Sequence, residues 1–354
     1  MEIKDSIAYN QVMNRKYDIL TIGRSSIDLY SNDLGAPFEK IQSFGAFVGG
    51  SSTNIAVGCN RLGLKTALLT AVGKDKVGDF ILHFLEEEGI ETQFIPAIEY
   101  ARTSAVILGI EPPERFPLVF YRDNCADIEL TIDHVINTNL ADFKGVVLSG
   151  TALSKDPSRT ATFFAAEEAL ANDVRIFLDL DFRADQWFDP RAYGITIRSL
   201  LPKVDFAIGT EEEILAASLQ NNNQITIKDQ QISAPVISGA IDEAIQKILD
   251  LGVKTLVVKR GSDGASIFEQ GKEEIKVLGF PVEVLNVLGA GDAFASGFVY
   301  GCLNNWDLYK SIRLGNACGA ILVTQHGCSN FSPTLEKALA FAEAKGGLDN
   351  RPTI

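Results

Sequence analysis

The chain has 354 residues, of which 46% are hydrophobic, and a formal net charge of −14. This length is enough to bury a large core, and the acidic balance argues against nucleic acid and against an anionic membrane surface as main partners. No apolar run approaches the length of a membrane span, and the polar N-terminus does not resemble a signal peptide. The five cysteines form no Cys-x-x-Cys pair and the three histidines are scattered, which favours reduced thiols in a cytoplasm and no zinc site.

Strands and helices are predicted to alternate along most of the chain. Residues 1–15 lack periodicity and are expected to form a loose N-terminal extension, followed by one domain over residues 16–348. Apolar runs predict buried strands at residues 17–22, 66–72, 145–150, 174–180, 204–208 and 255–258. Helical patterns predict helices at residues 55–62, 78–88, 158–172, 240–251, 307–323 and 334–346. This alternation favours an α/β fold with a mostly parallel central sheet covered on both faces.

The alternation of predicted strands and helices is interrupted between about residues 101 and 125. Two β-rich stretches, 103–111 and 118–122, are separated by a segment that contains three prolines. Such a pair indicates a small sheet that stands off the main one as a lid, with further lid strands from about residues 30–48. The edge of this sheet could pair with the lid of a second copy, so a homodimer through the lid is an open alternative. Residues 220–235 are polar and amide-rich, and we expect an exposed insertion there.

A glycine-rich turn at residues 289–291 carries the main functional signal. Gly289, Ala290 and Gly291 have little or no side chain and precede an apolar helical run, so free backbone N–H groups are expected at a helix N-terminus, where anions bind. Asp292 lies among them, and the helix dipole is expected to keep its carboxylate ionised near neutral pH. Anion-binding amides beside a base are what phosphoryl transfer to a hydroxyl requires. For this motif alone, an ordinary helix start with an Asp near its cap is the commoner interpretation.

Polar residues also follow the first predicted strand and an early glycine pair. Asp28 lies shortly after strand 17–22 and could bind sugar hydroxyls, although a plain turn residue is an equal alternative. Gly49 and Gly50 allow a close approach of the backbone to a ligand, and Asn54 could direct its amide into the same crevice.

Taken together, these motifs resemble the two signatures of the ribokinase-like (phosphofructokinase B type) carbohydrate kinases. Gly49-Gly50 with Asn54, Gly261 with Gly264, and residues 286–292 occur in the right order, and the resemblance spans about residues 17–345. It implies a three-layer α/β/α fold, a small β-sheet lid over the sugar, and ATP bound toward the C-terminal half. The chain lacks a Gly-x-x-x-x-Gly-Lys-Ser/Thr stretch, which excludes a P-loop kinase, and no Gly-x-Gly-x-x-Gly follows the first strand, which disfavours a nicotinamide dehydrogenase.

The same resemblance implies roles for individual residues. Asp292 would remove the proton from the sugar's terminal hydroxyl, while the turn amides stabilise the transferring phosphoryl group. Mg²⁺ would be held through waters near Glu213, and activation by a monovalent cation is left open. Many relatives carry Asn where this chain has Asp181 and Thr210, which weakens the assignment of phosphate contacts to Thr210. The residues expected to hold the sugar hydroxyls are Asp28, Gly49, Gly50 and Asn54, and those expected at the nucleotide are Thr210, Lys259, Gly261, Gly264 and Asn316.

Within the family, residues 112–127, 179–183 and 209–213 resemble the kinases that phosphorylate 5-dehydro-2-deoxygluconate in inositol catabolism. Tyr121 and Arg122 in the lid, and Arg183 after a core strand, are the residues expected at this substrate. Two guanidinium groups in one crevice would suit a carboxylate. As an alternative, each arginine pairs with a nearby Asp in a surface bridge, or one is directed at phosphate.

Other activities are also compatible with these residues. A kinase of the same fold could act on 2-keto-3-deoxygluconate or on a neutral sugar. A non-catalytic sugar-sensing protein is a further alternative, but it predicts loss of the base or of the glycine turn, and both are present.

Overall fold

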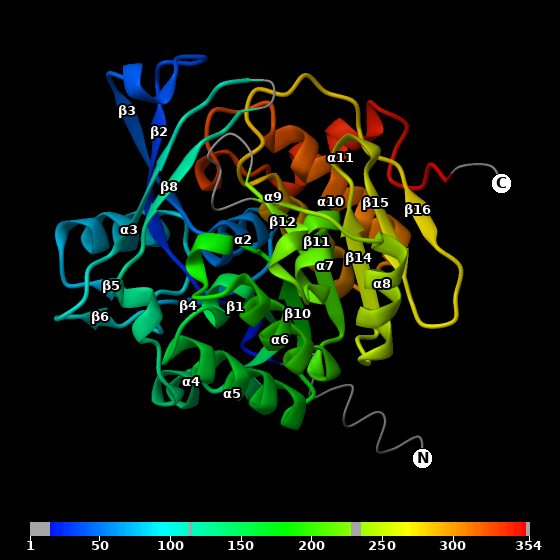
Figure 1. Cartoon of the computed structure of the whole chain (residues 1–354), viewed down its shortest axis with the longest axis horizontal. Coiled ribbons are helices and arrows are strands. Elements are labelled where there is room, and N and C mark those ends of the chain that lie inside the picture. Colours follow the sequence, from blue (N-terminus) through cyan, green and yellow to red (C-terminus); the bar gives the residue numbers. More distant parts are fainter. Residues whose placement is uncertain (1–14, 113–114, 228–234, 352–354) are drawn as a thin grey trace.

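The largest element of the structure is a mixed sheet of eight strands in the order β16-β15-β14-β11-β10-β9-β1-β4 (Figure 1). This computed structural model describes residues 15–112, 115–227 and 235–351. The six strands from β4 to β14 are parallel, and β15 and β16 continue the sheet as an antiparallel hairpin. The strands are β1 (Tyr17–Ile22), β4 (Thr66–Leu69), β9 (Phe143–Ser149), β10 (Arg175–Asp179), β11 (Phe206–Thr210), β14 (Thr255–Lys259), β15 (Ala265–Phe268) and β16 (Ile275–Val277).

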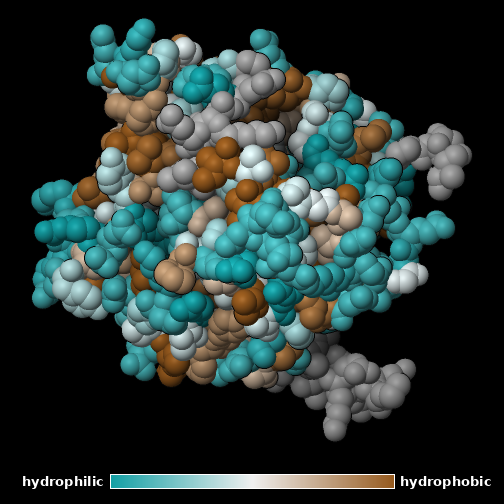
Figure 2. All heavy atoms as spheres, in the orientation of Figure 1, coloured by the Kyte–Doolittle hydropathy of each residue, from teal (hydrophilic) through white to brown (hydrophobic). Residues whose placement is uncertain are grey.

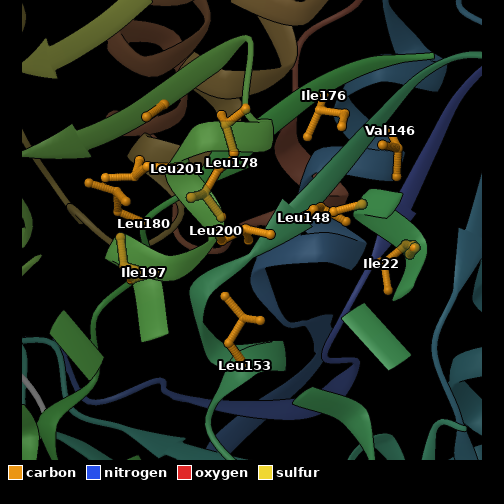
Figure 3. Packing of buried hydrophobic residues seen from close by; sticks show 14 of the residues in the cluster. Ile22, Val146, Leu148, Leu153, Ile176, Leu178, Leu180, Ile197, Leu200 and Leu201 are labelled. Atoms are coloured by element: carbon orange, nitrogen blue, oxygen red, sulfur yellow. The ribbon is translucent and has the colours of Figure 1, made fainter. Parts of the chain in front are cut away.

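Helices cover both faces of this sheet, which gives the predicted three layers (Figure 1). Successive residues of each strand point to opposite faces, so Ile176 and Leu178 of β10 pack toward one helical layer while Phe177 packs toward the other. Figure 3 shows the first of these layers, where Ile197, Leu200 and Leu201 lie near the strand side chains. The helices are α2 (Ser51–Arg61), α3 (Lys76–Glu87), α4 (Ile132–Thr138), α5 (Ser158–Ala171), α6 (Pro190–Leu200), α7 (Glu211–Ser218), α8 (Ile241–Asp250), α9 (Ala290–Leu303), α10 (Leu308–Leu322) and α11 (Leu335–Glu343).

A second, four-stranded sheet has the order β3-β2-β7-β8 and stands beside the main one at the upper left of Figure 1. On the face seen in Figure 2, apolar side chains gather near this sheet. Its strands lie close to the two ranges predicted for the lid, except that β2 starts earlier, directly after β1. We call this sheet the lid. Its strands are β2 (Ser26–Ser31), β3 (Phe44–Gly49), β7 (Ser104–Leu108) and β8 (Leu118–Tyr121).

The predicted strands and helices of the main sheet are confirmed to within a few residues, but two helices and one hairpin were missed. These are α6, α7 and the β15–β16 hairpin. Two further short pairs join β5 (Val72–Gly73) to β6 (Ala97–Ile98) and β12 (Ile225–Thr226) to β13 (Val236–Ile237).

Parts of two sequence predictions lie outside the described residues, namely 1–14 of the N-terminal extension and 228–234 of the polar insertion. Arg15, the last residue of the predicted extension, is described, and its guanidinium donates hydrogen bonds to the carbonyl oxygens of Phe143 and Asn172. All five cysteines are buried and free. None of the helices in the described ranges has the length and apolar character needed to cross a membrane.

Candidate active site

The turn at residues 289–292 lies between two cavities. Gly289 has a φ of 78°, and a Cβ there would lie 2.7 Å from Cβ of Cys328, so the turn requires glycine at this position. Gly289 and Asp292 line one cavity, whereas Ala290 and Gly291 line the other. The start of α9 therefore presents its carboxylate to the first cavity and its small, amide-bearing residues to the second.

The first cavity, which we call the lid cavity, lies between the lid and the carboxyl ends of the main-sheet strands. Its apolar side includes Val106, Leu108, Leu118 and Phe120 of the lid. Its polar side comes from α2, α9, lid strand β2 and the segments after β1 and β10. An apolar cover over convergent polar groups is typical of a small-molecule site. The polar and charged residues that line it are Arg24, Asp28, Tyr30, Ser51, Asn54, Asp181, Arg183 and Asp292.

The second cavity, which we call the C-terminal cavity, has a volume of about 490 Å³. One part is apolar, with Phe280, Pro281 and Val323 among its lining residues, and another contains Lys259 and the glycine turn. The Asn316 side chain donates a hydrogen bond to the carbonyl oxygen of Leu278 over 2.9 Å, which fixes it at the cavity wall. The structure thus brings together all five residues that were expected at the nucleotide, which are Thr210, Lys259, Gly261, Gly264 and Asn316.

Asp292 is half-buried, and its carboxylate is held by Asn54. The Nδ2 atom of Asn54 donates a hydrogen bond to Oδ2 of Asp292 over 2.7 Å. Burial, together with the negative charges of Asp179 and Asp181, raises the pKa of Asp292 to about 7. The expectation that the helix dipole keeps this carboxylate ionised near neutral pH is therefore wrong, because desolvation and like charges outweigh the dipole. A pKa near neutrality is well suited to a general base.

A largely enclosed ammonium group, that of Lys259 with a side-chain exposure of 13%, lies beside the turn. Lys259 Nζ is 3.6 Å from Oδ1 of Asp179 and 3.8 Å from Oε2 of Glu213. Burial by itself lowers the pKa of Lys259, but the Glu213 and Asp179 carboxylates outweigh it and raise the pKa overall, so the group stays charged. Burial raises the pKa of Asp179 to about 6. A Cβ at Gly291 would lie 2.9 Å from Lys259 Nζ, which places the ammonium group against the glycine turn.

Glu213 is engaged by the backbone on both oxygens. Oε2 accepts a hydrogen bond from the Thr210 amide over 2.8 Å, in the capping box that starts α7, and Oε1 accepts one from the Phe182 amide over 3.3 Å. In the described part of the chain, no group of three or more His, Cys, Asp or Glu side chains is arranged to hold a metal ion. The carboxylate expected near Mg²⁺ therefore has a clear structural role of its own.

The two lid residues expected at the substrate do not reach the lid cavity. Arg122 is buried in an ion pair, with Nη2 at 2.6 Å from Oδ2 of Asp127, and Nη1 donates to the carbonyl oxygen of Thr151. Tyr121 is 58% exposed and is absent from the cavity lining. The expectation that Arg122 enters the sugar crevice is therefore wrong, because a buried carboxylate five residues along the chain holds its guanidinium group.

Arg183 does line the lid cavity, and its Nη2 lies 3.2 Å from Oδ1 of Asp181, so it also forms the pair with a nearby Asp that was the alternative interpretation. Sequence analysis missed a second arginine there, Arg24, which is 6% exposed. Its position directly after the first strand and close to Asp28 is the signal that could have found it.

The early glycine pair accommodates protein groups behind the lid cavity. A Cβ at Gly49 would lie 2.0 Å from Oδ2 of Asp28, and a Cβ at Gly50, whose φ is 102°, would lie 2.4 Å from the carbonyl oxygen of Arg24. Gly50 lines the cavity, whereas Gly49 backs the Asp28 carboxylate. Burial raises the pKa of Asp28 to about 6, although Arg24 and the hydrogen bond from Ser26 act in the opposite direction.

Comparison with known proteins identifies the family to which this site belongs. Residues 16–335 match the model of the pfkB family of carbohydrate kinases. The chain belongs to this family. It is 33% identical over 334 residues, 94% of each chain, to a 5-dehydro-2-deoxygluconokinase from Clostridium botulinum. It is also 33% identical over 327 residues to one from Geobacillus thermodenitrificans, covering 92% of this chain and 93% of the relative.

Solved structures of sugar kinases share the fold. Fructokinase with bound ATP from Xylella fastidiosa aligns with a TM-score of 0.78 at 22% identity, over 93% of this chain and 99% of that one. A fructokinase double mutant from Vibrio cholerae O395, with fructose, ADP and a potassium ion bound, aligns with a TM-score of 0.77 at 24% identity, with the same coverage. The ribokinase-like fold implied by the sequence is thus confirmed, and the family membership makes the protein a carbohydrate kinase.

Proposed function

We propose that this kinase transfers the γ-phosphoryl group of ATP to the terminal hydroxyl of 5-dehydro-2-deoxy-D-gluconate, in the catabolism of myo-inositol. The observation that carries the proposal is the position of the turn at residues 289–292, whose carboxylate faces the lid cavity while Ala290 and Gly291 face the C-terminal cavity. The names of the relatives that are 33% identical support this choice of sugar. The sugar would occupy the lid cavity and ATP the C-terminal cavity.

Asp292 is proposed as the general base. Its Oδ2 already accepts the Asn54 amide, and its pKa near 7 lets it take the hydroxyl proton at physiological pH. The sugar oxygen then forms a bond to the γ-phosphorus as the bond to the ADP oxygen breaks. The backbone amides of Gly291 and Asp292, with Ala290 before them, stabilise the charge on the phosphoryl group without reorganising. Lys259, which lies against Gly291, adds a fixed positive charge on the nucleotide side.

Mg²⁺, when bound with ATP, would neutralise part of the phosphate charge, as it commonly does while retaining several water ligands. The carboxylates around Lys259 suit such contact through water. Oδ1 of Asp179 is buried without a hydrogen-bond partner, and Oε2 of Glu213 lies 3.8 Å from the ammonium group of Lys259. Both carboxylates could accept hydrogen bonds from metal-bound water. Asp179 would thus share the role that was expected for Glu213. Activation by a monovalent cation is left open.

The remaining residues would bind and enclose the sugar. Asp28, Gly50 and Asn54 line the lid cavity and are proposed to contact sugar hydroxyls, with Gly49 supporting Asp28 from behind. Arg183 is proposed to contact the carboxylate. Closure of the lid would exclude water, which otherwise competes as a phosphoryl acceptor.

We also propose that the enzyme works in the cytoplasm, which suits its five free thiols. A homodimer through the lid is supported by the exposed apolar side chains of its edge strands, Phe44, Val119 and Tyr121. Light scattering during gel filtration, on the wild type and on Tyr121→Ser, tests this assembly. A wild-type monomer at micromolar concentration would contradict it.

The function is tested by measuring ADP release with Mg-ATP on 5-dehydro-2-deoxygluconate, 2-keto-3-deoxygluconate, fructose and ribose. We expect the highest kcat/KM with 5-dehydro-2-deoxygluconate and a product that carries phosphate on its terminal hydroxyl. Preference for 2-keto-3-deoxygluconate or for a neutral sugar would contradict the substrate while leaving a sugar kinase. If neither the wild type nor the Asp292→Asn variant released ADP with any of these acceptors, a sugar sensor of the same fold would be favoured.

A further inference from the structure

We propose that Arg24 is the residue by which this kinase selects an acidic sugar, binding the substrate carboxylate in the lid cavity. The inference rests on the proposed function, because it requires a sugar that carries a carboxylate. Arg24 lies in the short segment between β1 and β2 and lines the cavity whose other charged residues include Arg183 and Asp292. No sequence motif singled it out, and its assignment comes from its surroundings.

Arg24 is a buried cation without an acidic partner. Among the residues that the structure describes, it forms no ion pair within 4.0 Å, and its Nε atom is buried without a hydrogen-bond partner. Its Nη1 atom donates to the hydroxyl of Ser26 over 2.7 Å. Arg122 provides the contrast within the same protein, since it is equally buried but is neutralised by Asp127. A buried charge that lacks a direct ion-pair partner is costly, and a bound anion in direct contact would offset part of that cost.

The nearby carboxylates already have other donors. Asp28 accepts a hydrogen bond from Ser26 over 2.7 Å, and Asp181 is bonded by Thr151 and lies beside Arg183. Arg24 lowers the pKa of both carboxylates through space, so it helps to keep them ionised, but it donates no hydrogen bond to either. Its free donors therefore remain available to a ligand in the cavity.

The lid also contacts the Arg24 guanidinium. The ring centroid of Phe120, on lid strand β8, lies 5.1 Å from the guanidinium carbon. A cation–π contact uses no N–H donor, so guanidinium N–H groups stay available for a carboxylate, which they match with two parallel hydrogen bonds. Phe120 also lines the cavity, so the same residue would cover the bound sugar. A sugar acid bound in this way would place its carboxylate at Arg24 and its terminal hydroxyl at Asp292.

The test compares 5-dehydro-2-deoxygluconate with its methyl ester, which keeps the sugar skeleton but removes the negative charge. The ratio of kcat/KM for the acid to kcat/KM for the ester is measured for the wild type, Arg24→Met and Arg24→Lys. This ratio does not depend on the fraction of folded enzyme. Truncating one partner of a buried hydrogen-bonded charge pair commonly costs 2–5 kcal/mol, so we expect the ratio to fall at least about 30-fold in Arg24→Met. We expect the ratio for Arg24→Lys to lie between those of the wild type and Arg24→Met. An ammonium group keeps the positive charge but lacks the two parallel N–H donors of a guanidinium.

Arg115→Met is the matched control, because Arg115 lies beside the lid strands but is exposed and pairs with Glu111. Its ratio should equal that of the wild type. A wild type that prefers the acid, together with an unchanged ratio in both Arg24 variants, would overturn the role of Arg24 and leave the proposed function standing. A wild type that does not discriminate against the ester, or that prefers neutral sugars, would refute the acidic substrate itself.

Discussion

The side-chain amide of Asn54 donates a hydrogen bond to the carboxylate of Asp292 over 2.7 Å, so the residue expected to bind sugar also holds the proposed base. The hydroxyl of Ser329 donates to Oδ1 of the same amide, which keeps its nitrogen directed at Asp292. Burial and the negative charges of Asp179 and Asp181 raise the pKa of Asp292. The hydrogen bond from Asn54 and the positive charge of Lys259 lower it. Ser329 is therefore a positioning residue for the base, two steps from the reacting atoms.

Replacing Ser329 by Ala should move the pH profile of the enzyme. Without the hydroxyl the Asn54 amide is free to turn, the charged form of Asp292 loses a donor, and its pKa rises. We expect the acid limb of kcat/KM to shift upward by about half to one pH unit, with near-normal activity above pH 8.5. The limb is measured from pH 5.5 to 9. Ser329→Thr should restore it, and Ser332→Ala should leave it in place. A uniform loss of activity at every pH would instead indicate a purely structural role.

Asp292→Asn should abolish most turnover while leaving the fold intact. The amide accepts the Asn54 hydrogen bond as the carboxylate does, but it takes no proton from the sugar hydroxyl. General base catalysis contributes typically about 10²–10⁴-fold, so kcat should fall by that factor. Steady-state ADP release with circular dichroism of the same preparation measures both properties. A variant with a near-normal rate would refute the assignment of the base.

The same variant should be more stable than the wild type at alkaline pH. The pKa of Asp292 rises from 3.8 to about 7 on folding, so between these values the folded protein holds a proton that the unfolded chain releases. Ionisation therefore destabilises the folded state increasingly as the pH rises through this window, and fully above it. Each pKa unit corresponds to roughly 1.4 kcal/mol, and we expect Asn to raise the free energy of unfolding by at least about 1 kcal/mol at pH 8. Urea titrations at pH 5 and pH 8 test this, and a gain that is larger at pH 5 would contradict it.

Much of the fold and the location of the turn could be predicted from the sequence, because they depend on local patterns. Strand β1 coincides with its prediction, since a buried parallel strand is a continuous apolar run. Helix α6 was missed although Asp189 caps it and Pro190 follows in its first turn, which is a start signal that the sequence does display.

The sequence does not show which charged side chains lie close together in the folded protein. The pKa of Asp292 depends on burial and on Asp179 and Asp181, which lie at the end of β10 and just after it, more than a hundred residues earlier in the chain. Arg122 and Arg183 were predicted to share a crevice. The sequence does not show that Arg122 is instead paired inside the protein, or that Arg24, which was not predicted, lines the cavity without a direct ion pair. That distinction requires the partners of each guanidinium group in three dimensions.

Arg122→Met should therefore affect stability and not substrate choice. The side chains of Arg122 and Asp127 are 2% and 1% exposed, and removal of one partner leaves the other charge buried alone. Such losses cost about 3–5 kcal/mol, so the free energy of unfolding in urea should fall by that amount. Arg159→Met, which breaks the exposed ion pair with Asp156, is the control and should cost less than about 1 kcal/mol. A changed preference between the acid and its methyl ester in folded Arg122→Met would show that Arg122 does reach the sugar.

Lys259→Met should lower kcat/KM for ATP and also raise the pKa of the proposed base, Asp292. Its ammonium group lies against Gly291, so its loss removes a positive charge from the expected position of the ATP phosphates. It also removes the cation that lowers the pKa of Asp292, so the acid limb of the pH profile should move upward. We expect kcat/KM for ATP to fall at least about 100-fold at pH 7.5, a loss of roughly 2.7 kcal/mol of transition-state stabilisation. Lys276→Met, on the exposed edge strand β16, is the control and should match the wild type. If kcat/KM for ATP and the acid limb both stayed at wild-type values in Lys259→Met, ATP could not be placed against this lysine.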